Sequence, residues 1–164
     1  MKIRALLLVS AMIFSASVSA QGVSGLGYYQ LDDDDIAVGA LVGSFGYRYQ
    51  ANDVVSFVPE IRGGFGVKDD NFLGAKVKLK GLVGAALRAE FAVSAPVYVF
   101  ASTSYTHYKF KASVSGVGSA SASDEEFGFG GGIGFNVAEE GSIELSYEKL
   151  DEIGVIGASL RFNF

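Results

Sequence analysis

The chain has 164 residues, the length of a single domain, and carries a formal net charge of −5. An acidic chain of this kind does not indicate nucleic acid as a partner, and zero cysteines exclude a disulfide scaffold and thiol chemistry. His107 is the one histidine, so a zinc site is not expected, and we predict no metal and no cofactor.

The first predicted element is an export signal over residues 1–20. Lys2 and Arg4 precede the apolar run ALLLVSAMIF, and SVSA before Gln21 is typical of a cleavage site. The alternative is a single membrane helix, which would need roughly 20 apolar residues. Cleavage would leave residues 21–164 as one domain of 144 residues (164 minus 20). Its net charge would be −7, since Lys2 and Arg4 are lost and 11 basic residues face 18 acidic ones.

From residue 22 onward, apolar and polar residues alternate with the period of two that is typical of strands. The gaps after the second, fourth and sixth segments are about four residues each, whereas 112–125 is long and predicts a mobile surface loop. Eight segments are predicted, at 22–31, 36–49, 54–66, 72–92, 97–111, 126–137, 142–150 and 153–164.

Most segments have one apolar face and one polar or glycine face. In the fourth, Val77 and Leu79 are expected on the apolar face with Val83, and Lys78 on the polar face. The first and fifth segments allow no assignment, which leaves the facing of His107 open, and a local bulge is predicted at Pro59. The polar faces together hold four arginines and four glutamates: Arg48, Glu60, Arg62, Arg88, Glu90, Glu144, Glu148 and Arg161.

Two architectures fit this alternation. A soluble barrel points its apolar face inward, whereas an outer-membrane barrel points it at lipid. Short turns at one end and more variable gaps at the other favour the membrane barrel. So do aromatic residues at strand ends, which interfacial girdles require: Tyr47, Tyr49, Tyr147, Phe162 and Phe164.

The chain ends on GASLRFNF, in the middle of a predicted strand. A terminal Phe164 with Phe162 and Leu160 on the same face resembles the signal by which outer-membrane barrels are recognised for assembly. Together with FGYRYQAND, FGFGGGIGFN and IELSYEKL, it makes the chain resemble the OmpA/OmpX-like outer-membrane β-barrel family of Gram-negative bacteria.

The resemblance implies an all-β fold, an eight-stranded antiparallel up-and-down transmembrane β-barrel, located in the outer membrane and without a peptidoglycan-binding domain. It implies outer-membrane lipid and lipopolysaccharide as surroundings, the barrel-assembly machinery as a partner of the C-terminal strand, and a monomer. Eight strands enclose just enough space for side chains, so a general porin is not expected. We predict instead that the eight charges pair in the interior; in a soluble fold they would be solvated surface charges.

The expected function is a structural or surface-interaction role. One alternative is a soluble periplasmic barrel that binds an apolar ligand. Another is a lipid A-modifying barrel enzyme, which would need a serine two residues from a histidine. Here Tyr105 precedes His107 and Lys109 follows it, and no acid is expected on a matching face, so we predict no enzyme. The run DDDD (32–35) predicts an exposed acidic turn rather than a specific calcium site.

Overall fold

The computed structural model describes residues 20–33, 36–72, 75–114, 118–151 and 153–164, and the predicted export signal lies outside them except for Ala20. These residues contain no helix that is long and apolar enough to cross a membrane. The strands in the described residues are β1 (Ala20–Asp33), β2 (Ile36–Gln50), β3 (Val55–Lys68), β4 (Asp70–Phe72), β5 (Ala75–Ser94), β6 (Val97–Val114), β7 (Gly118–Asn136), β8 (Gly141–Leu150) and β9 (Ile153–Asn163).

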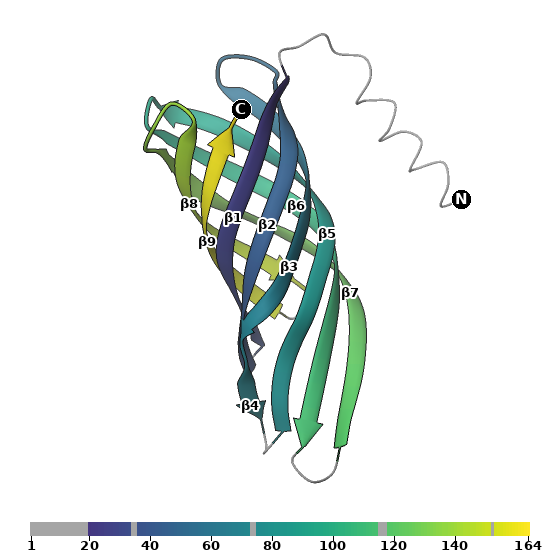
Figure 1. The fold of residues 1–164 in the computed structure, drawn as a ribbon. Helices are drawn as coiled ribbons and strands as arrows, with labels where there is room; N and C mark the ends of the chain where they lie inside the picture. Colours follow the sequence, from purple (N-terminus) through teal and green to yellow (C-terminus); the bar gives the residue numbers. More distant parts are fainter. Residues whose placement is uncertain (1–19, 34–35, 73–74, 115–117, 152) are drawn as a thin grey trace, which may run out of the picture.

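The strands form a closed antiparallel barrel (Figure 1). Except for β3 and β4, neighbours in sequence pair with one another. β3 pairs with β5, and β9 returns to pair with β1, so eight strands complete the ring. The three-residue β4 follows β3 after Asp69 and pairs with β5. The predicted eight-stranded fold is therefore confirmed.

Closure occurs where the described chain begins and ends. Gly22 and Phe164 exchange two backbone hydrogen bonds of 2.9 Å, and the register continues from there along β1 and β9. Gly22 leaves room for the Phe164 ring, which would have to move if a Cβ atom were present, since the two would lie 2.5 Å apart. The last strand thus removes an edge that would otherwise expose unpaired backbone groups.

The strands at one side of the barrel extend far beyond those at the other. β6 and β7 stay paired as far as Val114 and Gly118, whereas β8 leaves β7 at the pair of Gly128 with Leu150. As Figure 1 shows, β5, β6 and β7 project as a sheet past the ends of β8 and β9. The prediction of a loop over 112–125 was therefore wrong, since most of this stretch is a hairpin arm of β6 and β7.

A bulge in β5 reverses the faces of its first residues. The register with β6 shifts between Leu79 and Gly81, so Lys80 is an extra residue. Beyond it, Val83 and Leu87 point outward as expected, but Leu79 is buried in the interior and Lys78 lies on the outside. The assignment of Leu79 and Val77 to the same face as Val83 was wrong, because one inserted residue exchanges the two faces.

Pro59 does not form a bulge. The register of β2 and β3 is the same on both sides of it, from Gly46 with Glu60 to Tyr49 with Phe57, and Pro59 keeps its place opposite Leu87 of β5. The only register shift in β2 and β3 lies between Gly39 and Ala40. The predicted bulge was wrong. Beside Pro59, β2 and β3 lack the residue pairs between Gly46–Glu60 and Tyr49–Phe57, but no residue is inserted.

The barrel interior has two layers. Toward the end with the short turns it is polar and holds the charged residues. Toward the projecting end it is apolar, whereas the sequence predicted a polar lining throughout. This apolar layer consists of Leu31, Val38, Ala40, Val42, Leu79, Tyr108, Leu150 and Val155.

Candidate functional site: the interior charge network

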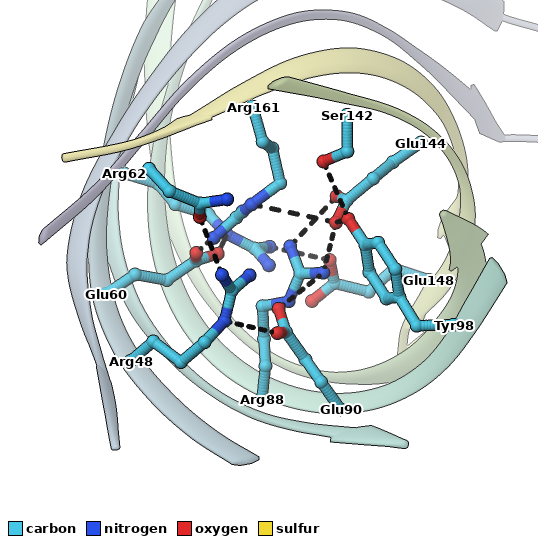
Figure 2. A network of polar contacts seen from close by, with 11 residues as sticks. Arg48, Glu60, Arg62, Arg88, Glu90, Tyr98, Ser142, Glu144, Glu148 and Arg161 are labelled. Atoms are coloured by element: carbon cyan, nitrogen blue, oxygen red, sulfur yellow. Dashed lines mark hydrogen bonds and ion pairs between the residues drawn. The ribbon is translucent and has the colours of Figure 1, made fainter. Parts of the chain in front are cut away.

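The eight charged residues expected in the interior come from five strands and meet on the axis of the barrel (Figure 2). Each points inward because its strand neighbours point at the surroundings: Leu145 is 56 % exposed while Glu144 is 2 % exposed. The period of two along each strand therefore carries these side chains from positions far apart in sequence into one cluster.

Glu144 and Arg88 form the centre of the cluster. The two guanidinium Nη atoms of Arg88 donate to the two carboxylate oxygens of Glu144 at 3.0 and 2.6 Å, the two-bond geometry that suits these groups best. Tyr98 donates its hydroxyl to Glu144 at 2.6 Å, and Arg161 Nε lies 3.6 Å from the same carboxylate. Arg88 also lies 3.3 Å from Glu90, and its guanidinium carbon lies 3.8 Å from the centre of the Phe100 ring.

Glu60 links a second group of charges. It accepts hydrogen bonds from Arg161 at 2.9 Å and from Arg62 at 2.8 Å. Arg62 donates in addition to Glu148 at 2.9 Å, and Ser104 donates to the same carboxylate. Because Arg161 contacts both Glu60 and Glu144, the two groups form one network.

Arg48 closes the network toward the short turns. Its Nε donates to Glu90 at 2.9 Å and its Nη1 donates to the side chain of Asn163 at 2.6 Å. Every arginine of the described chain is thus engaged by a glutamate, and four positive charges balance four negative ones. Charges this far from water are tolerable only when they are paired and hydrogen-bonded in this way.

Sequence reasoning missed the uncharged members of the network. Tyr98 and Phe100 lie on β6, where both faces are mixed, and Ser142 contacts Tyr98 at 2.9 Å. A usable signal existed on the neighbouring strand: Gly134 pairs with Tyr98 and Gly132 with Phe100, and a Cβ atom at Gly132 would lie 2.5 Å from the Phe100 ring. The glycine face of β7 is the space that these two rings occupy.

The network fills its layer of the barrel. A cavity of about 10 Å³ lies beside Arg88 and Glu144. Another of about 30 Å³ lies between the charged and apolar layers. Spaces of this size hold about one water molecule each. The arrangement can stiffen the barrel and block its axis. No group of side chains suited to a metal ion occurs among the described residues.

His107 lies on the outward face of β6, two residues from Tyr105. Its Nδ1 is 3.7 Å from Glu125 of β7, and the Tyr105 hydroxyl donates to the same carboxylate. The expectation that no acid lies on a matching face was wrong, because residue 125 belongs to a strand opposite His107 and not to a loop. The three side chains lie on the outer surface of the barrel, away from the charge network.

The closed barrel, its apolar exterior and its paired interior define the class of outer-membrane β-barrel proteins. Residues 5–163 match the model of the outer membrane protein beta-barrel domain family, and the chain belongs to that family. This membership decides between the two architectures that the alternation alone left open.

Solved structures agree with the fold. Ail, the attachment invasion locus protein of Yersinia pestis, is 20% identical with a TM-score of 0.61, covering 88% of this chain and 97% of Ail. The N-terminal barrel of Pseudomonas aeruginosa OprF is 14% identical with a TM-score of 0.62, covering 89% and 100%. Neisserial surface protein A is 14% identical with a TM-score of 0.56, covering 88% and 97%. No curated protein sequence matches the chain.

Proposed function

We propose that this protein is a closed outer-membrane barrel that acts through its surface, as a rigid mount for a projecting sheet, and neither conducts solutes nor catalyses a reaction. The charge network serves as a plug that holds the wall in one shape. The export signal over residues 1–20 is removed on the way to the membrane, and the outward face of Leu160, Phe162 and Phe164 is the part that the barrel-assembly machinery reads.

The observation that carries the surface role is the free edge of β7. Over residues 118–125, β7 pairs with β6 on one side, and no described strand pairs with it on the other. Such an edge presents alternate backbone N–H and C=O groups and is a template for another strand. Proteins that have no use for an open edge cover it or place lysine or proline there.

The side chains of this edge favour access. Residues 119–123 read SASAS, and none of their side chains is large enough to shield the backbone. Asp124 and Glu125 follow, so the part of the edge nearest the closed barrel is acidic. An extended polypeptide with a basic residue at one end is the partner that fits, adding itself to the sheet as one more strand.

A peptide with the sequence of residues 109–114 of β6, KFKASV, tests the edge because β6 already pairs with β7. Hydrogen exchange of the folded protein should slow at alternate amides of residues 118–125 when the peptide is added. Ala120→Lys with Ala122→Lys, which lie opposite Ala112 and Phe110, should abolish this protection. Ala112→Lys, on the fully paired β6, should leave it intact. Unchanged exchange in the wild-type protein at saturating peptide would refute the proposed edge.

A further inference from the structure

Five lysines gather on the outside of the projecting sheet, where β5 and β6 leave the barrel. The bulge at Lys80 places them there: Val77 and Leu79 turn inward, so their neighbours Lys76 and Lys78 turn outward. On β6, the inward Tyr108 and Phe110 likewise leave the lysines between and beyond them on the outside. The lysine patch consists of Lys76, Lys78, Lys80, Lys109 and Lys111.

These lysines are held close together. Lys78 pairs directly with Lys111, and Lys109 pairs with Gly81, the residue after Lys80. Like charges directly opposite each other on one face of a sheet destabilise it unless another charge compensates. A bound anion would therefore stabilise the patch by reducing the repulsion between its lysines.

The protein supplies little of that compensation. Asp69 lies 3.1 Å from Lys76 and 3.0 Å from Lys78. Lys80, Lys109 and Lys111 form no ion pair with any residue that the structure describes. The patch thus keeps a charge of about +4, five lysines less one aspartate, although the whole chain is acidic.

Basic residues are sorted in this chain. The four arginines of the described residues all lie in the interior network, whereas five of the seven lysines there lie in the patch. Arginine suits fixed two-bond pairing with carboxylates, and lysine is a mobile point charge that also binds phosphate. This distribution fits a fixed charge network in the interior and an anion-binding site on the outside.

The height of the patch identifies the anion. Outward residues are mainly apolar over 83–91 of β5, 97–105 of β6 and 127–135 of β7, nine residues in each case. A tilted strand needs roughly 9–11 residues to cross the hydrocarbon layer. Lys80 and Lys109 come within four residues of the outer ends of these spans, at the level of the lipid headgroups.

We propose that the lysine patch binds the phosphate groups of a phosphorylated glycolipid in the outer leaflet. The site uses lysine side chains of β5 and β6, whereas the proposed edge uses backbone groups of β7, so either can fail without the other. Bound glycolipid would fix the projecting sheet relative to the membrane plane.

The test uses native mass spectrometry of the folded, full-length barrel in zwitterionic detergent with added bisphosphorylated lipid A. Wild-type protein should retain lipid A and should not retain the same lipid stripped of both phosphates. Each lysine near an anionic surface contributes about fivefold in affinity. Lys80→Gln, Lys109→Gln and Lys111→Gln together should weaken retention on the order of 100-fold, and arginine at these positions should restore it.

Lys149→Gln is the matched control, because Lys149 lies on β8 outside the patch, and it should leave retention unchanged. Heat-dependent gel mobility verifies that each variant is folded. Equal retention of the phosphate-free lipid, or full retention by the triple glutamine variant, would overturn the proposal. Tighter lysine-dependent binding of soluble heparin than of lipid A would overturn it as well, because the site would then serve a soluble sulfated polysaccharide.

Discussion

Removing Glu144 should strongly destabilise the barrel. Glu144 is the carboxylate that both Arg88 and Arg161 approach, and it also accepts the Tyr98 hydroxyl. With Glu144→Ala, Arg88 would keep Glu90 at 3.3 Å and Arg161 would keep Glu60 at 2.9 Å. Four arginines and three glutamates would then remain, which leaves one buried positive charge uncompensated.

The magnitude follows from this stranded charge. Breaking a buried ion pair by removing one partner costs about 3–5 kcal/mol. Because the remaining glutamates still offset part of the charge, we expect the lower end of this range for Glu144→Ala. Glu144→Gln keeps the shape and one acceptor, so its cost should be smaller. The exposed Glu139, in the turn before β8, is the control, and Glu139→Ala should change stability by less than about 0.5 kcal/mol.

The assay is urea unfolding of the barrel in detergent micelles, followed by the loss of the heat-resistant compact band. A compensating variant sharpens it: Glu144→Leu together with Arg88→Met removes the pair as a whole and should recover most of the lost stability. If Glu144→Ala unfolded at the same urea concentration as the wild type, the claim that these charges form a buried, mutually dependent network would be refuted.

Further predictions concern the exterior, the terminus and the projecting end. Leu145→Arg should lower the free energy of unfolding by about 2–4 kcal/mol, because it places a charge against lipid, whereas Leu145→Phe, which keeps an apolar group there, should cost far less; equal costs would contradict the facing. Deleting Phe164 should reduce the membrane-inserted fraction on heat-modifiability gels without reducing export. The pKa of Asp70 is lowered, first by the Ala37 N–H and then by the Asn71 N–H. The contact of Asp70 with Ala37 should thus be complete above the ordinary aspartate pKa and be lost as the pH falls through the lowered value, which an NMR titration of the Ala37 amide would follow.

Sequence patterns were sufficient where one face of a strand meets lipid and the other meets the interior. β8 illustrates this, since Glu144 and Leu145 alternate without interruption and both faces were assigned correctly. β5 shows the limit, because the inserted Lys80 leaves apolar and basic residues alternating on both sides while exchanging their faces. A bulge of one residue is invisible to a period of two unless the partner strand is known.

The prediction of a loop over 112–125 failed for a different reason. Its strands project beyond the membrane, so neither face has to be apolar, and small residues such as Ser121 and Ala122 carry no alternation. Their strand conformation comes from pairing along β6, a tertiary effect. The inward position of Tyr98 was missed because its ring fills the space left by the absent side chain of Gly134. Only the pairing of β6 with β7 shows that these two residues lie opposite each other.

We propose that the barrel axis is blocked by the charge network and its apolar cover, so that the protein acts at its surface. Ion current through the purified wild-type protein, inserted singly into a planar lipid bilayer, tests this most directly. We predict no steady current at moderate voltage in the wild type and in Glu139→Ala. A steady, voltage-proportional current through the wild-type barrel would contradict the account.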